Sequence, residues 1–257
     1  MPAAVPHLPI ALRNRSPPLP FHGRGHGLFF PFRYNVFMPK LEQIQKAIAQ
    51  AGTMVDLALV LAVDCSSSVD EGDYRLQMDG IAKALRNPPL YDAIAAGPYG
   101  RIALTLVHWS NLKSQVVAIA WGVIASKLDL EAAARRAETV ERQWKPGGTG
   151  LAAAIDFSAA LLRTLPAVAT RRIIDVSGDG EDNEGGDVPR ARRDALAQGI
   201  TINGLPILYG SSTLKSYYRK NVIGGPGAFI MPARNMQSFA DAMTQKLLRE
   251  VAMKATA

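Results

Sequence analysis

The stretch Val55-Asp56-Leu57-Ala58-Leu59-Val60-Leu61-Ala62-Val63-Asp64-Cys65-Ser66-Ser67-Ser68 decides the fold class of this chain. Its apolar run is interrupted only by Asp56 and ends at Asp64. A short, nearly continuous apolar run is typical of a strand that is buried on both faces of a parallel sheet. The polar residues that follow the run, from Asp64 to Ser68, would then form a loop at the carboxyl end of that strand.

The residues after this strand alternate between helical and strand patterns. Helices are expected over residues 74–85, 130–142, 151–162, 189–198 and 236–251, and further strands over residues 101–109, 115–119, 171–176, 200–208 and 228–231. The first helix should be broken at Pro88-Pro89, and a short polar turn between residues 109 and 115 suits a hairpin. The alternation predicts an α/β fold with a doubly wound, mostly parallel central sheet and helices on both faces.

Residues 1–50 differ from the rest in being basic and rich in Pro and Gly. They hold six Lys or Arg against one acid, and Arg15-Ser16-Pro17-Pro18-Leu19-Pro20 cannot form a helix. We therefore expect a disordered or poorly ordered arm over residues 1–50 and one domain over residues 54–252. The arm lacks the continuous apolar segment of a secretory signal, which predicts a cytoplasmic protein. A periplasmic or secreted protein is expected instead if the true start differs, and Met38 and Met54 are the candidate starts.

The charge balance and the cysteine count exclude several classes of function. The formal net charge is +7, but the 207 residues after residue 50 hold 23 basic and 21 acidic side chains. A nearly balanced domain carries no electrostatic signature of nucleic-acid binding. The single cysteine, Cys65, rules out an internal disulfide and a cysteine-based zinc site, and strand alternation should turn its side chain into the core. No apolar run is long enough for a membrane span.

Oxygen-bearing side chains follow two predicted strands and precede one predicted helix. Asp64, Ser66 and Ser68 follow the first strand, Thr149 lies in Gly147-Gly148-Thr149-Gly150 before a helix, and Asp179 follows the strand that ends at Val176. Ligands of doubly wound sheets bind at the carboxyl ends of the strands, where the strand order reverses. Hydroxyls and carboxylates without His or Cys favour a hard cation such as Mg²⁺ or Mn²⁺. The sequence predicts a metal site at Asp64, Ser66, Ser68, Thr149 and Asp179.

These residues also carry a resemblance to known families. Asp64-x-Ser66-x-Ser68, followed by Thr149 and Asp179, resembles the metal-ion-dependent adhesion site (MIDAS) of von Willebrand factor A domains. From Met54 to Val251, the chain is similar to a family of uncharacterised bacterial proteins with this fold, a domain of unknown function (DUF1194). Members usually begin with an export signal, which residues 1–50 do not show. The resemblance implies inner ligation by the hydroxyls, ligation by the aspartates largely through water, and a carboxylate from a protein partner completing the shell.

Three interpretations of the predicted site remain open. The first is a non-catalytic, metal-dependent protein-binding module, because no nucleophile–base pair is evident. The alternative is a metal-dependent phosphohydrolase in which Asp64 attacks phosphorus. It is disfavoured because Ser66 stands where haloacid-dehalogenase-like phosphatases carry a general acid. The third is a structural domain with a vestigial site. Among nearby residues, Asp175 is expected to be a buried, hydrogen-bonded acid rather than an extra ligand, and Asp182 and Asn183 to lie in a solvated loop.

Overall fold

A computed structural model describes residues 52–143 and 147–253 of the chain, and the expected arm of residues 1–50 lies outside them. The strands are β1 (Met54–Val55), β2 (Leu57–Asp64), β3 (Ile102–Trp109), β4 (Gln115–Ile124), β5 (Val168–Ala169), β6 (Arg172–Gly178) and β7 (Thr201–Pro206). The helices are α2 (Glu71–Leu85), α3 (Pro88–Ala95), α4 (Lys127–Thr139), α5 (Leu151–Arg163), α6 (Val188–Ala197), α7 (Leu214–Tyr217) and α8 (Phe239–Ala252). A π-helical turn, Tyr218–Val222, continues α7, and a 3-10 turn, Met236–Ser238, precedes α8. None of the described helices is both long and apolar enough to cross a membrane.

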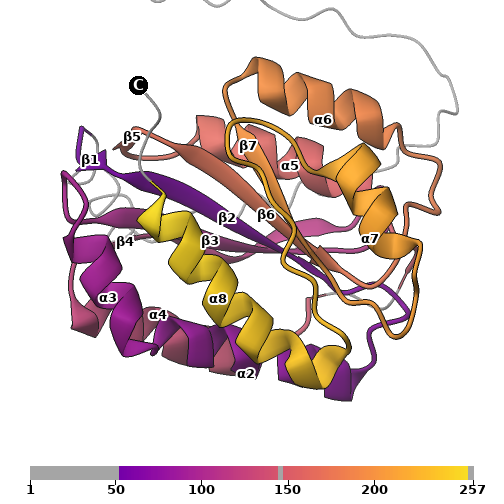
Figure 1. Cartoon of the computed structure of the whole chain (residues 1–257), viewed down its shortest axis with the longest axis horizontal. Coiled ribbons are helices and arrows are strands. Elements are labelled where there is room, and N and C mark those ends of the chain that lie inside the picture. The colour runs from indigo at the N-terminus through magenta and orange to yellow at the C-terminus, as the bar shows by residue number, and fades with distance from the viewer. Residues whose placement is uncertain (1–51, 144–146, 254–257) are drawn as a thin grey trace, which may run out of the picture. The chain divides into compact units, whose positions relative to one another are not determined.

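The central sheet is doubly wound, as predicted. Its strand order is β4-β3-β2-β6-β7, and every neighbouring pair is parallel except the β3–β4 hairpin. The chain adds β3 and β4 on one side of β2 and later adds β6 and β7 on the other side. The strand order therefore reverses beside β2, and the crevice at the carboxyl ends of β2 and β6 is where such sheets bind ligands. These ends lie at the right in Figure 1, beside α7 and the start of α2.

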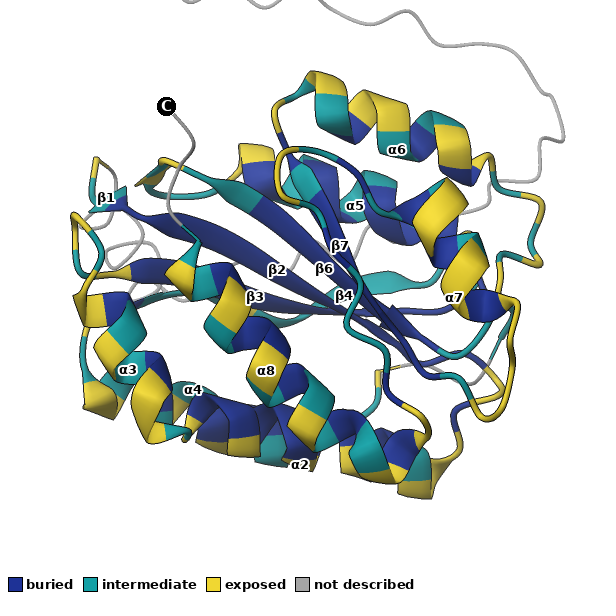
Figure 2. Ribbon diagram, in the orientation of Figure 1, coloured by how far each residue is buried: buried dark blue, intermediate teal, exposed yellow. Residues whose placement is uncertain are grey.

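Two layers of helices cover the two faces of the sheet (Figure 1). All eight residues of β2 are buried (Figure 2). Their apolar side chains alternate between two cores, one on each face of the sheet. Leu57, Leu59, Leu61 and Val63 pack with residues of α2, α3, α4 and α8, whereas Ala58, Val60 and Ala62 pack with α5 and α6. Cys65 is buried in the first core, as expected from alternation. Burial on both faces explains the continuous apolar run that identified this strand.

Local departures from the predicted elements have side-chain causes. Asp56 divides the predicted first strand into β1 and β2, because its carboxylate accepts hydrogen bonds from the backbone N–H groups of Tyr99, at 3.0 Å, and Arg101, at 3.3 Å. Pro88 does end α2, but it also begins α3, since a proline in the first turn leaves no additional hydrogen bond unmade. The expected strand over residues 228–231 is wrong: it contributes only an isolated bridge between Ile230 and Gly204.

The C-terminal helix is anchored to the sheet by buried charges. The Nζ atom of Lys246 in α8 lies 2.7 Å from Oδ1 of Asp175 in β6 and 2.5 Å from Oε1 of Glu250. All three side chains are buried. The other partner of Glu250 is Asn203 in β7, whose amide donates to the same Oε1 atom at 2.8 Å. Asp175 is thus a buried acid, as expected, but its partner is a lysine of the C-terminal helix and not a neighbouring loop.

The buried His108 makes the stability of the domain sensitive to acid. Burial lowers the pKa of His108 from 6.5 to about 4, and its ring packs edge-to-face on Tyr74 at 5.5 Å. Between these pH values the unfolded chain binds a proton that the folded chain does not, so stability falls as the pH falls through this range. We expect His108→Phe, which keeps the ring contact, to remove about 2–3 kcal/mol of the stability loss between pH 7.5 and 4.5. Urea unfolding of both proteins at the two pH values measures this difference. Parallel pH dependence in the two proteins would contradict it.

Candidate metal site

Four of the five predicted ligands are joined by short contacts at the ends of β2 and β6. Oδ1 of Asp64, the last residue of β2, accepts a hydrogen bond from the backbone N–H of Ser66 at 2.7 Å. The Ser66 and Ser68 hydroxyl oxygens lie 3.1 Å apart, and the Ser68 hydroxyl donates to Oδ1 of Asp179 at 2.6 Å. Asp179 directly follows Gly178, the last residue of β6. The switch point of the sheet therefore gathers two carboxylates and two hydroxyls, as the sequence predicted.

The loop after β2 is held by residues that are distant in the sequence. Nη2 of Arg142 donates to the backbone carbonyls of Cys65, at 2.7 Å, and Ser66, at 2.9 Å. Nε2 of Gln77 in α2 donates to the carbonyl of Asp64 at 3.1 Å. The sequence predicted that Arg142 is the last residue of a helix over residues 130–142, but α4 ends at Thr139. Arg142 instead lies after the helix, and its guanidinium holds the loop that carries the two serines.

Thr149, the fifth predicted ligand, is positioned by the loop that follows Asp179. Its backbone N–H donates to Oδ1 of Asn183 at 2.7 Å, and the Asn183 N–H donates back to the Thr149 carbonyl at 3.0 Å. The Asp182 carboxylate accepts from the N–H groups of Ala152 and Gly186. Asp182 and Asn183 do lie in a partly exposed loop, as expected, and their side chains also fix the backbone around Thr149. The signal available in the sequence was their residue type, because Asp and Asn side chains bind backbone N–H groups in Gly-rich loops.

The Thr149 side chain lies beside the loop that carries Asp179. A β-carbon at Gly180 would lie 3.4 Å from the Thr149 hydroxyl oxygen, so the hydroxyl lies directly beside this backbone. Thr149 itself is buried, with 4% of its surface exposed. All five predicted side chains thus belong to one small region, with Ser68 exposed on its outer side and Asp64 at its buried base.

The electrostatics of the region favour a cation. Asp64 is completely buried, and burial raises its pKa from 3.8 to about 7, although the N–H of Ser66 opposes the shift. Burial also raises the pKa of Asp179, against the hydrogen bond from Ser68. Within the described residues neither carboxylate forms an ion pair, and Oδ2 of Asp64 has no hydrogen-bond partner. A buried carboxylate without a counter-charge is costly, and a bound cation would remove that cost.

The donor set fits a hard divalent cation. It consists of oxygen atoms only, which is the preference of Mg²⁺ and Mn²⁺. In residues 52–143 and 147–253, no group of three or more His, Cys, Asp or Glu side chains is placed to hold a metal. A cation here would therefore depend on the Ser66, Ser68 and Thr149 hydroxyls together with the two aspartates.

The rim of the site carries a strained aromatic residue that sequence reasoning missed. Tyr209 follows β7, has φ +40°, and leaves half of its surface exposed. Its hydroxyl donates to Oδ2 of Asp73 in the first turn of α2 at 2.6 Å. Bulky residues at positive φ are uncommon and occur preferentially at functional positions. Asp70 and Glu71, next to Asp73, are also exposed, so the rim is acidic and aromatic.

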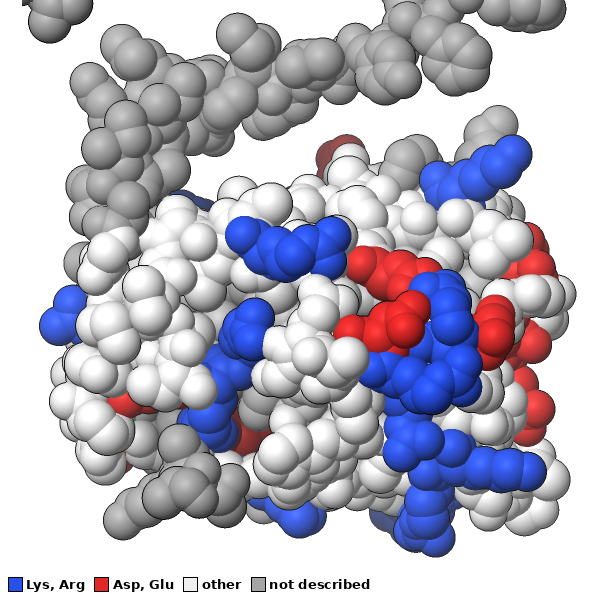
Figure 3. Space-filling model, turned by 90° about the horizontal axis from the view of Figure 1, so that it is seen from above, with Lys and Arg blue, Asp and Glu red and all other residues white. Residues whose placement is uncertain are grey.

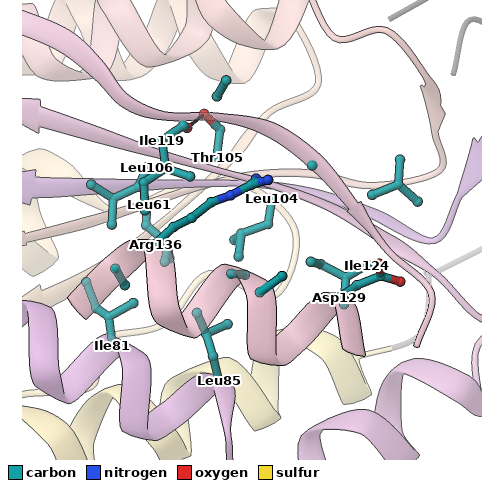
Figure 4. Close-up of a pocket in the computed structure, with 16 residues that line it drawn as sticks. Leu61, Ile81, Leu85, Leu104, Thr105, Leu106, Ile119, Ile124, Asp129 and Arg136 are labelled. Carbon is teal, nitrogen blue, oxygen red and sulfur yellow. Dashed lines mark hydrogen bonds between the residues drawn. The ribbon is translucent and has the colours of Figure 1, made fainter. Parts of the chain in front are cut away.

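A second hollow lies away from the strand ends. It is an apolar cavity between β3, β4, α2 and α4, with the Arg136 side chain running along Leu61 and Leu104 (Figure 4). The Thr105 hydroxyl donates to the carbonyl of Ile119 at 2.7 Å, and Asp129 accepts from Ser126 at 2.8 Å. The Arg136 guanidinium also lines the cavity, so this hollow combines apolar walls with a cationic group, in contrast to the hydroxyls and carboxylates at the strand ends.

The surface over α5 and α6 mixes both signs of charge (Figure 3). Arg190 lies 2.6 Å from the Asp156 carboxylate and 3.1 Å from the Asp194 carboxylate. Local pairing of this kind removes much of the positive field that a nucleic-acid-binding face needs.

Comparisons with known proteins identify the family and the fold. The sequence profile of a family described as "Protein of unknown function (DUF1194)" matches residues 54–255. No curated protein matches the chain.

Among solved structures, proximal thread matrix protein 1 from the mussel byssus, with a zinc-occupied MIDAS motif, is 15% identical with a TM-score of 0.55 over 77% of this chain and 46% of that one. The von Willebrand factor type A protein from Catenulispora acidiphila is 16% identical, with a TM-score of 0.51 over 77% and 42%. A mutant of the PilB minor pilin from Streptococcus sanguinis is 14% identical, with a TM-score of 0.50 over 77% and 62%. The chain spans about half the length of these proteins, and the likeness establishes a von Willebrand factor A-like fold.

Proposed function

The chain belongs to the DUF1194 family, and on this premise we propose that it is a non-catalytic binding module that uses one divalent metal ion to hold a carboxylate of a protein partner. The observation that carries the proposal is the pair of aspartates, Asp64 and Asp179, desolvated beside three hydroxyls and without an ion-pair partner among the described residues. The zinc-occupied MIDAS motif of proximal thread matrix protein 1, which shares the fold, supports the same use of this sheet edge.

The residues proposed to hold the ion divide by their chemistry. The hydroxyls of Ser66, Ser68 and Thr149 would be direct ligands, and the carboxylates of Asp64 and Asp179 would act largely through water. Mg²⁺ keeps several waters and takes few protein ligands, so this set suits Mg²⁺, or Mn²⁺ in its place. When bound, the ion would supply a coordination position that a carboxylate of the partner can take. Arg142 and Asn183 would keep the two ligand loops in place.

Among the described residues, the groups nearest to a catalytic role are poorly suited to it. Burial raises the pKa of Cys65 to about 12, so its thiol stays protonated and is a poor nucleophile. His108 is buried against Tyr74. The phosphohydrolase alternative still has Ser66 at the position of its general acid, where a hydroxyl cannot serve that role well. These features favour binding over catalysis.

Selection from a displayed library of random peptides in millimolar Mn²⁺ tests this proposal. We expect the recovered peptides to share an Asp or Glu, because a carboxylate completes the coordination of the ion. Lys or Arg should flank it, because the exposed Asp70 and Glu71 on the rim disfavour further acids. Binding of the recovered peptides should disappear in EDTA and in Asp64→Asn, and persist in Asp194→Asn, which alters an exposed acid of α6. Peptides without carboxylates, or equal recovery in EDTA, would refute the mechanism.

A further inference from the structure

Three buried side chains with unpartnered polar atoms surround Gly178 beneath the metal site. Oδ2 of Asp64, the hydroxyl of Tyr218 and Nε1 of Trp109 each lack a hydrogen-bond partner in the described part of the chain. All three side chains are fully buried. A β-carbon at Gly178 would lie 2.9 Å from Oδ2 of Asp64, 3.0 Å from the Tyr218 hydroxyl and 3.2 Å from Cζ2 of Trp109. A side chain at Gly178 would therefore crowd both oxygens and the edge of the indole ring, so glycine lets these groups lie close to one another.

The fold brings them together from three separate segments. Trp109 ends β3 and is the register partner of Asp64, so both lie at the same sheet edge. Tyr218 comes from the turn after α7, where the chain forms a π-helical turn, a feature often found at functional sites. Its ring crosses β7 at Gly204, where a β-carbon would lie 2.7 Å from Cδ1 of the ring. Glycines on two neighbouring strands, Gly204 and Gly178, thus make room for the ring and its hydroxyl.

The three groups have complementary hydrogen-bonding chemistry. The indole N–H can only donate, the phenol can donate, and a carboxylate only accepts. Ordered buried waters typically bridge two to four polar groups that would otherwise be unpaired. A buried water in contact with these groups could accept from Tyr218 and Trp109 and donate to Asp64.

We propose that Tyr218 is a positioning residue of the metal site, acting with Trp109 through one buried water on Oδ2 of Asp64. This inference rests on the proposed function, because it assigns to Tyr218 the task of orienting a metal-site carboxylate. Groups that hydrogen-bond the outer side of a ligand typically change metal affinity by 10- to 100-fold. Tyr218 and Trp109 lie far from Asp64 in the sequence, and the sequence pattern assigns neither of them to the site.

Calorimetric titration of Tyr218→Phe with Mn²⁺ tests the role of the hydroxyl. The change keeps the ring that fills the space over Gly204 and removes only the donor. We expect the dissociation constant to rise roughly 10- to 100-fold. The midpoint of urea unfolding in EDTA should stay unchanged. Tyr91→Phe is the control, since Tyr91 packs against the distant Lys127, and its affinity should equal that of the parent chain.

The outcomes separate this inference from the proposed function. If the parent chain binds no Mn²⁺, the proposed function fails. If the parent binds and Tyr218→Phe binds equally well, only the positioning role is overturned. If Tyr218→Phe is less stable than the parent in EDTA but binds Mn²⁺ equally well, Tyr218 has a purely structural role, and the positioning role is again overturned. Should Tyr218→Phe fail to fold, Trp109→Phe provides the second variant. We expect the same loss of Mn²⁺ affinity, and an affinity equal to that of the parent would overturn the positioning role.

Discussion

Replacing Lys246 with methionine is expected to destabilise the domain by about 3–5 kcal/mol, because the change leaves Asp175 and Glu250 buried without their shared cation. Methionine fills most of the same space, so the effect would report the charge and not a cavity. The free energy of urea unfolding in EDTA measures it without interference from a metal.

A matched control separates a buried ion pair from an exposed one. Lys83 in α2 also pairs with an acid of α8, Asp241, at 3.2 Å, but both side chains are largely exposed. Lys83→Met should therefore change the unfolding free energy by less than about 1 kcal/mol. Similar small effects for the two lysines would contradict the claim that the buried network anchors α8 to the sheet.

Asp64→Asn should have opposite effects on stability and on metal binding. The buried carboxylate has no cation beside it within the described residues, and burial raises its pKa to about 7, so its ionised form destabilises the metal-free fold at pH 8. A neutral amide can still accept the hydrogen bond from Ser66. We expect the variant to be more stable than the parent in EDTA at pH 8 by roughly 2–4 kcal/mol. We also expect it to gain no stability from Mg²⁺, whereas the parent gains about 2.7 kcal/mol at a hundredfold excess of the ion over its dissociation constant.

Asp70→Asn is the control for this pair of effects. Asp70 lies six residues further along, is exposed, and caps α2 by accepting from the N–H of Asp73. Asparagine caps helices about equally well, so this variant should match the parent in stability and in its response to Mg²⁺. An Asp64→Asn protein that is less stable than the parent in EDTA would show that the carboxylate is satisfied within the protein, and the case for a bound cation would weaken.

Strand periodicity was sufficient to predict the sheet and the gathering of the candidate site's side chains at one end of it. The apolar run that ends at Asp64 and the shorter one that ends at Val176 identify β2 and β6, and the carboxyl ends of parallel strands meet at one edge. That rule alone brings Asp64, Ser66 and Ser68 next to Asp179. The strand expected at residues 228–231 was wrong because the segment pairs with β7 only at the isolated bridge between Ile230 and Gly204.

The supporting residues could not be predicted in the same way. Arg142 and Tyr218 reach the site by the length of their side chains from elements whose position is set by long-range packing. Neither periodicity nor capping rules describe such contacts. The position of Asn183 and Tyr209 near the candidate site was easier to predict, because both residues follow strands whose carboxyl ends lie at the same end of the sheet. Residue type and strand ends therefore locate the candidate ligands, whereas the residues that contact their loops emerge only from the three-dimensional structure.

Titration of the purified chain with Mn²⁺, followed by the electron paramagnetic resonance signal of the free ion, tests the central claim most directly. We expect one Mn²⁺ ion to bind per chain. Excess Mg²⁺ should displace this ion, and the Asp64→Asn variant should not bind it. Free Mn²⁺ that rises in proportion to the amount added, even at millimolar concentration, would contradict the metal site. Binding that persists unchanged in Asp64→Asn would contradict its location.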